Sequence, residues 1–262
     1  MLSCDSLVNY SKERGMPPGK LRGAAREYLQ VLTLKALYNL SGAKKLLFLG
    51  GTALRLGYDL PRFSEDLDFD AKQLSPGDWK ALLGETAHAL SRQGFSIELK
   101  TGEKGGLLTG DLRCKGFLQA YNLSGDVGEK LRIKLETNRP DYPLTAEPRV
   151  VSGYGEMFPV PFAARGMMFA EKILALLNRE MGRDVYDIFF MSGKKWLPDA
   201  RILSVKKAGN PAETILSRVA AWEPAELSGM ARRLEPFLFE PEQSKLVAQA
   251  RKLLPPALQY LE

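Results

Sequence analysis

The chain has 262 residues, 45% of them hydrophobic and 26% charged, which predicts a folded protein with one large domain or two modest ones. Its two cysteines and single histidine exclude a disulfide scaffold, a four-cysteine zinc site and an HExxH zinc peptidase, and it has no G-x-S-x-G motif of serine hydrolases. The net charge of +6 suits a polyanionic partner such as RNA or nucleoside phosphates, or simply solubility. No apolar run approaches the ~18 residues of a membrane span, and the first 15 residues lack a secretory apolar core, so we expect a cytoplasmic protein with no membrane partner.

Hydrophobic periodicity predicts helices and strands in mixed order over the first part of the chain. The expected helices cover 22–40, 52–60 and 76–93. The expected strands cover 44–51, 66–71, 95–100, 111–123 and 129–138, with an edge strand over 147–153. Because most of these strands follow the helix of 76–93, a mixed sheet is favoured over a strictly alternating parallel one.

The pattern becomes purely helical after Pro161. Apolar residues recur at helical spacing over 162–180, 184–193 and several segments of 211–262. We therefore predict an α+β protein with two domains. An α/β domain covers 1–160, with a helical lead-in over 1–42, and a helical domain covers 161–262.

A double glycine stands where a predicted strand turns into a predicted helix. The strand ends at Gly50 and Gly51, and the helix starts at about Thr52. Glycines allow the backbone to turn sharply, and the first N–H groups of a helix have no partners within it. The turn is therefore a candidate seat for an anion such as a triphosphate, with Gly50, Gly51 and Thr52 as candidate nucleotide-binding residues.

Two aspartates follow on the next predicted strand. Asp66 and Asp68 are two residues apart, so both carboxylates face one side of the strand while Leu67 and Phe69 face the other. Two carboxylates on one face repel each other unless a cation lies between them. Oxygen ligands of this kind favour Mg²⁺ or Mn²⁺, with substrate phosphates and water completing the coordination shell.

The combination of these motifs resembles the polymerase-β-like nucleotidyltransferases, and in particular the abortive-infection toxins of the AbiEii/AbiGii class, which includes the MenT toxins. The resemblance covers roughly 45–190 and rests on three segments in the family's order. The second and third of these segments are RIKLETN (132–138) and FAEKILALLNREMGRDVYDIFFM (169–191). The first is a GGTxL…R-x-S-x-D-[LI]-D-F pattern, present as Gly50, Gly51, Thr52, Leu54, Arg62, Ser64, Asp66, Leu67, Asp68 and Phe69. Thr52 stands where many members of the broader superfamily have serine, which keeps the hydroxyl.

The resemblance implies a polymerase-β-like mixed sheet followed by a C-terminal helical domain, with the active site in the cleft between them. It implies nucleotidyl transfer, in which an acceptor hydroxyl attacks the α-phosphate of an NTP and pyrophosphate leaves. Asp66 and Asp68 would be catalytic metal ligands. Glu136 is the candidate third carboxylate, which would hold a second metal and orient the acceptor. The alternative for Glu136 is a salt-bridged strand face shared with Arg132 and Lys134.

The family's catalytic lysine and aspartate match Lys172 and Asp187. Lys172 lies beside an apolar helical stripe, so it either extends to water or points at phosphates. Arg55 and Arg62 are candidates for holding the triphosphate. Ser64 either contacts the nucleotide or caps the turn.

The implied function is that of a metal-dependent nucleotidyltransferase, an enzyme of EC 2.7.7 type. By resemblance, the acceptor is the 3′ end of tRNA, and the enzyme is the toxin of a type IV toxin–antitoxin system with a cognate antitoxin encoded nearby. One alternative is a nucleotidyltransferase that modifies a small molecule or a protein hydroxyl. The other is a non-catalytic nucleotide-binding module.

Overall fold

The computed structural model describes residues 1–261 and divides them into two compact units. The first unit comprises Met1–Pro140 and Pro148–Phe162. The second comprises Asp141–Glu147 and the chain from Ala163 onward. The short segment 141–147 thus belongs to the second unit although strands of the first unit flank it in sequence. Glu262, the last residue of the predicted helical domain, lies outside the described residues.

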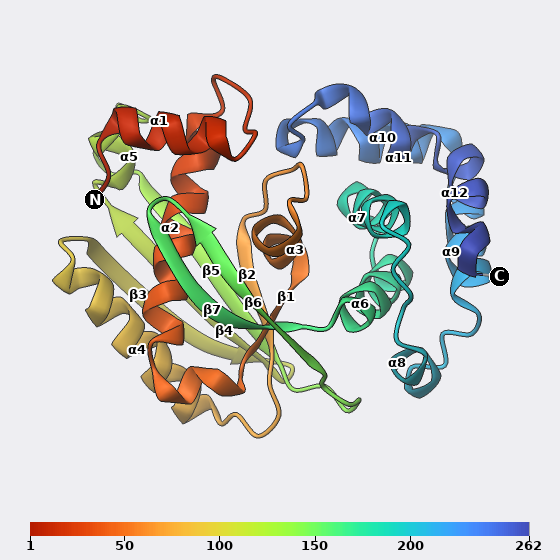
Figure 1. Ribbon diagram of the computed structural model, residues 1–262, viewed down its shortest axis with the longest axis horizontal. Helices are drawn as coiled ribbons and strands as arrows, with labels where there is room; N and C mark the ends of the chain where they lie inside the picture. The colour runs from red at the N-terminus through yellow and green to blue at the C-terminus, as the bar shows by residue number, and fades with distance from the viewer. Residues whose placement is uncertain (262) are drawn as a thin grey trace. The chain divides into compact units, whose positions relative to one another are not determined.

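A mixed sheet forms the centre of the first unit, as the sequence predicts, and it has seven strands where six were expected (Figure 1). Its spatial order is β3-β4-β5-β2-β1-β7-β6. β1 pairs in parallel with β7, and β2 pairs in parallel with β5, whereas the pairs β1–β2, β3–β4 and β4–β5 are antiparallel. The strands are β1 (Leu47–Leu49), β2 (Asp66–Asp70), β3 (Ser96–Lys104), β4 (Leu107–Lys115), β5 (Lys130–Asn138), β6 (Ala146–Gly153) and β7 (Glu156–Ala163).

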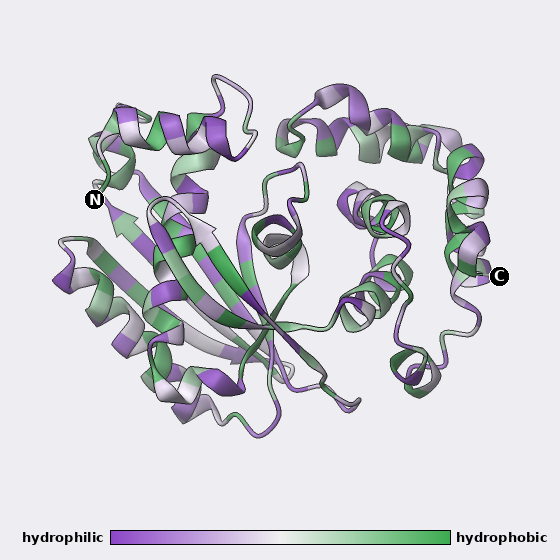
Figure 2. Cartoon of the chain, in the orientation of Figure 1, coloured by the Kyte–Doolittle hydropathy of each residue, from purple (hydrophilic) through white to green (hydrophobic). Residues whose placement is uncertain are grey.

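Side chains alternate between a buried and a polar face along β4 and β5, which appears as alternating green and purple in Figure 2. Helices cover the buried face, where the Phe69 ring lies against Tyr38 and Trp79. Gly110 lets a helix approach the sheet, since a Cβ there would lie 2.2 Å from the side chain of Leu83. The helices of this unit are α1 (Cys4–Glu13), α2 (Leu21–Tyr38), α3 (Gly50–Tyr58), α4 (Pro76–Arg92) and α5 (Phe117–Ala120), with a 3₁₀ turn over Ser41–Lys45.

Two features of this unit differ from the sequence prediction, and one further expectation is confirmed. The predicted strand over 111–123 is wrong in its second half, because Gly116 adopts a φ of 73° and the chain then forms the short helix α5. The edge strand over 147–153 is confirmed as β6 at the end of the sheet. β7 was not predicted, whereas α1 lies within the helical lead-in expected over 1–42. β7 carries Pro159 and Pro161, which are depleted in strands, yet it alternates buried and exposed residues and pairs with β1 through Phe48 and Phe162.

The second unit is helical, as predicted. Its core contains apolar residues of α6 and α7 such as Phe169, Ile173 and Ile188. The helices are α6 (Arg165–Asn178), α7 (Gly182–Gly193), α8 (Ala200–Val205), α9 (Pro211–Ala220), α10 (Pro224–Leu234), α11 (Lys245–Ala248) and α12 (Ala250–Leu258), with 3₁₀ turns over Glu235–Phe237, Pro241–Ser244 and Gln259–Leu261. Within residues 1–261, none of the helices is long and apolar enough to cross a membrane.

Candidate active site

The double glycine forms the junction between β1 and α3. Gly50 has a φ of 80°, which lies in the left-handed region that favours glycine. A Cβ at this position would lie 2.3 Å from Oδ2 of Asp68. The register of the sheet explains this proximity, because Leu49 pairs with Asp68. The Asp68 carboxylate therefore lies directly against the turn.

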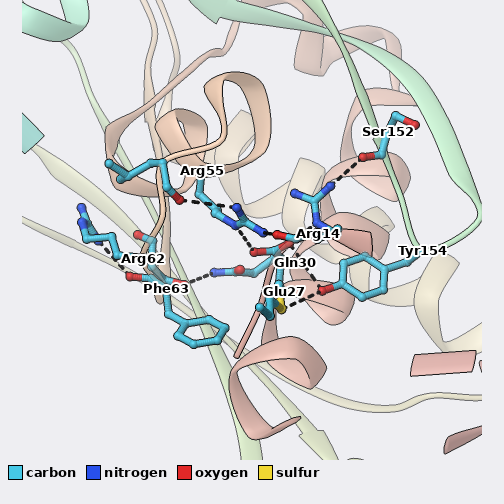
Figure 3. Close-up of polar contacts among 11 residues, drawn as sticks. Arg14, Glu27, Gln30, Arg55, Arg62, Phe63, Ser152 and Tyr154 are labelled. Atoms are coloured by element: carbon cyan, nitrogen blue, oxygen red, sulfur yellow. Dashed lines mark hydrogen bonds and ion pairs between the residues drawn. The ribbon is translucent and has the colours of Figure 1, made fainter. Parts of the chain in front are cut away.

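Gly51 brings two more of the predicted residues to the start of α3. A Cβ on Gly51 would lie 2.6 Å from Nη2 of Arg62 and 2.7 Å from Oγ of Ser64. The Arg62 side chain is buried, and its Nη1 donates to the carbonyl oxygen of Phe63 over 2.9 Å (Figure 3). A guanidinium thus lies at the amino end of a helix, where both the cation and the first N–H groups favour an anion.

Asp66 and Asp68 both lie on the polar face of β2. Both are partly exposed, whereas Leu67 and Phe69 between and after them are buried, as a two-residue period requires. Thr52 is fully buried, and its hydroxyl donates to the carbonyl oxygen of Asp66 over 2.5 Å. In this structure Thr52 ties the first turn of α3 to the start of β2.

Glu136 lies next to the aspartates but has another contact. Its Cα pairs in register with that of Asp68, so the two side chains share a face of adjacent strands. Its Oε1 lies 2.7 Å from Nζ of Lys134, while Arg132 binds Asp111 instead. Among residues 1–261, no three His, Cys, Asp or Glu side chains gather as a ready-made metal site. The structure thus places all three predicted carboxylates on one face of β2 and β5, without the close grouping of three ligands that a preformed metal site has.

Two carboxylates are enough for the type of site that the sequence predicts. Mg²⁺ is commonly bound by one or two protein carboxylates together with substrate phosphates and waters. Asp66 and Asp68 supply hard oxygen ligands on one face, beside a turn that is suited to phosphates. The donor set therefore fits a divalent cation that binds together with a nucleotide.

Arg55 is placed differently from Arg62. Its side chain is only 3% exposed, and its Nε donates to Oε2 of Glu27 over 2.9 Å (Figure 3). Its Nη2 donates to the carbonyl oxygen of Arg14, also over 2.9 Å. These contacts favour a structural role for Arg55 over the expected contact with the triphosphate. The sequence does not single out Glu27, because it lies on α2 among other polar residues such as Arg26 and Gln30, and its partner Arg55 is 28 residues away.

The second unit contains a buried charge cluster centred on Lys172. Its Nζ lies 2.7 Å from Oδ2 of Asp187 and 3.1 Å from Oδ1 of Asp184. The guanidinium of Arg179 also donates to Asp184, over 2.7 and 2.9 Å. The side chains of both aspartates are fully buried. The structure thus joins the predicted Lys172 and Asp187 and adds Asp184 as a second partner of the lysine.

Asp184 is expected to make stability depend on pH in the acid range. Burial by itself raises the pKa of this carboxyl, but Lys172 and Arg179 outweigh it and lower the pKa to about 2. The stabilisation, about 2 kcal/mol, is therefore present above the ordinary pKa near 4 and is lost as pH falls toward 2. Urea unfolding between pH 2 and 5 should show this slope, and Asp184→Asn should flatten it. An unchanged slope in the variant would contradict the assignment.

Replacement of Gly50 by alanine is expected to destabilise the first unit by about 1–3 kcal/mol, because it combines a left-handed φ with a clash against Asp68. The matched control is Gly84→Ala in α4, where a new Cβ has no heavy atom within 4 Å. This control should stabilise by up to about 1 kcal/mol through helix propensity. Chemical unfolding of both variants measures the difference. Equal stabilities would show that the turn tolerates a side chain.

Comparison with known proteins gives one family and a shared fold. The model of the family described as "Nucleotidyl transferase AbiEii toxin, Type IV TA system" matches residues 33–251. MenT4, a nucleotidyltransferase toxin from Mycobacterium tuberculosis H37Rv, is 17% identical, with a TM-score of 0.61 and coverage of 100% of this chain and 94% of that one. JHP933 from Helicobacter pylori is 21% identical, with a TM-score of 0.57 and coverage of 92% and 93%. No curated protein matches the chain.

Proposed function

The chain belongs to the AbiEii family of nucleotidyl transferase toxins, and from that premise we propose that it moves a nucleoside monophosphate from an NTP to the 3′ end of tRNA with Mg²⁺ or Mn²⁺. As a member of this family it is a nucleotidyltransferase toxin of a type IV toxin–antitoxin system, which implies an NTP substrate and an antitoxin partner. The metal, the tRNA acceptor and action in the cytoplasm are the proposed additions.

One observation carries the proposed metal chemistry. Asp66 and Asp68 share the polar face of β2, and Asp68 lies against Gly50 at the amino end of α3. This arrangement puts candidate cation ligands beside a candidate phosphate site within one unit. A bound cation would neutralise charge on the triphosphate and on the departing pyrophosphate.

The chain's own residues would have separate tasks. We propose that the N–H groups at the start of α3, together with Arg62, bind phosphate oxygens and that Ser64 lines the same seat. Thr52 holds the backbone of Asp66 and thereby the carboxylate pair. We propose that Glu136 gives up its contact with Lys134 when the acceptor binds. Its carboxylate would then orient the attacking hydroxyl of the acceptor.

The cluster of the second unit is proposed to serve the same reaction. Lys172 carries a cation that is suited to phosphate oxygens, and Asp184 and Asp187 hold its ammonium group from two sides. Long lysine side chains lose orientation unless such contacts restrain them. We therefore propose that Lys172 and Asp187 are required for transfer, with Asp184 supporting the lysine.

The test is transfer of label from NTPs. The purified protein is incubated with each α-³²P-labelled NTP, total tRNA and Mg²⁺. Label is expected on tRNA, and both EDTA and Asp66→Asn should abolish it. The matched control is Glu85→Gln, which removes an exposed carboxylate on α4.

Two results would reject the proposal in different ways. Label on protein or on a small molecule, but never on RNA, would reject the tRNA acceptor and leave the enzyme class standing. Absence of transfer to every acceptor with all four NTPs would favour a non-catalytic nucleotide-binding module.

A further inference from the structure

One face of α2 contacts the segments that carry the candidate nucleotide and metal residues. Gly23, Glu27 and Gln30 are spaced three and four residues apart, so they share this face. All three precede the family match, which starts at residue 33. The support that they provide is therefore a property of this chain that the family match does not cover.

Gln30 binds the backbone immediately before the carboxylate pair. The residue is only 1% exposed. Its Nε2 donates to the carbonyl oxygens of Ser64 and Glu65 over 3.0 and 2.9 Å, so both amide hydrogens have acceptors. The hydroxyl of Thr52 holds the next carbonyl oxygen, that of Asp66. Two buried side chains thus fix three consecutive carbonyl groups at the start of β2.

The same helix face holds the neighbouring segments in place. Glu27 accepts from Arg55 of α3 and from Arg14, and the hydroxyl of Tyr154 lies 3.4 Å from it (Figure 3). At Gly23, a Cβ would lie 2.4 Å from the ring of Phe63, so the helix lies directly on the loop before β2. Because α2 contacts both α3 and this loop, it is a rigid base for the turn and for the strand.

We propose that Gln30 is a positioning residue for the Asp66–Asp68 pair. It does not touch the cation or the substrate. It fixes the backbone that orients the two carboxylates, as outer-shell hydrogen bonds fix the ligands of metal sites. The inference rests on the proposed metal-dependent function.

The variant Gln30→Leu tests the role of the two hydrogen bonds, because it keeps most of the side-chain volume and removes both donors. Binding of Mn²⁺ in the presence of a non-hydrolysable NTP is measured by electron paramagnetic resonance, together with the Mg²⁺ concentration that gives half-maximal transfer. We expect both affinities to weaken by about 10–100-fold, the range for loss of an outer-shell partner.

The matched control is Thr33→Val on the same helix. Thr33 is fully buried, and its hydroxyl donates to the carbonyl oxygen of Leu29, within α2. Loss of this hydroxyl should lower thermal stability without changing the affinity for Mn²⁺. Gln30→Met, with an unbranched chain, is the second variant in case Gln30→Leu does not fold.

The outcomes separate the inference from the proposed function. Wild-type affinity for Mn²⁺ in a folded Gln30 variant would overturn the positioning role while leaving the metal site standing. Equal weakening in Thr33→Val would overturn it too, because general destabilisation would then account for the effect. If the wild-type protein bound Mn²⁺ no better than Asp68→Asn, the proposed metal site would be rejected, and so would the positioning role of Gln30.

Discussion

Exchange of Asp68 for asparagine is expected to lower the rate of nucleotidyl transfer by about 10³-fold while the protein stays folded. Asparagine keeps the shape of the side chain, which lies against Gly50, but removes one of the two charges on the polar face of β2. Charge stabilisation by a bound metal amounts to several kcal/mol, and each ~1.4 kcal/mol corresponds to a tenfold change in rate. The measurement is kcat/KM for the NTP at saturating tRNA over a range of Mg²⁺ concentrations.

The controls for this variant separate catalysis from folding. Asp66→Asn should give a loss of similar size, because both carboxylates are proposed to hold the cation. Glu85→Gln should leave the rate unchanged, and circular dichroism should show all three variants folded. A rate within tenfold of wild type for Asp68→Asn would contradict the metal assignment.

Exchange of Lys172 for methionine is expected to lower the free energy of unfolding by about 3–5 kcal/mol, the usual effect of removing one partner from a buried ion pair. Methionine preserves the length of the chain but leaves Asp184 and Asp187 without the cation that contacts both. Urea unfolding at pH 7 measures the loss. Lys172 should therefore affect both stability and activity.

The destabilisation caused by Lys172→Met should also depend on pH, and it should become smaller as the pH falls. In the wild type, stability falls as pH drops below 4, because Lys172 helps to hold the pKa of Asp184 at about 2. Without the lysine, Arg179 alone opposes the effect of burial on Asp184, so the pKa of that carboxyl rises. Acidification then neutralises Asp184 at a higher pH in the variant, which narrows the difference in the free energy of unfolding between variant and wild type. A gap that stayed constant from pH 7 to 4 would contradict this account.

Two further variants complete the test of Lys172. Lys172→Met combined with Asp187→Asn should be less destabilised than the single variant, because one buried charge is removed together with its partner. Lys252→Met replaces an exposed lysine of α12 and should change stability by less than about 0.5 kcal/mol. A double variant no more stable than the single one would indicate lost packing in place of lost charge balance.

Local sequence patterns were sufficient to predict most of the helices and strands, together with the carboxylate pair and the glycine turn of the candidate site. The two-residue period of β2 places Asp66 and Asp68 on one face, and this follows from backbone geometry alone. The Gly50–Gly51 turn and the helix after it are likewise contained within a few consecutive residues. Gly116 shows the limit of such reasoning, because one left-handed residue ended a strand whose alternation would otherwise continue.

The amino-acid sequence by itself determined which residues could form an anion seat, a carboxylate pair and a mixed sheet, because each depends on neighbours two to four positions apart. Only the tertiary structure decided which arginine lies at the turn. Arg55 is bound by Glu27, 28 residues away, while Arg62 packs on Gly51. It also decided that Gln30 holds the start of β2 and that Asp184 joins Lys172. Such contacts join segments that are distant in the sequence and depend on how the elements pack. The spacing of neighbouring residues therefore cannot predict them.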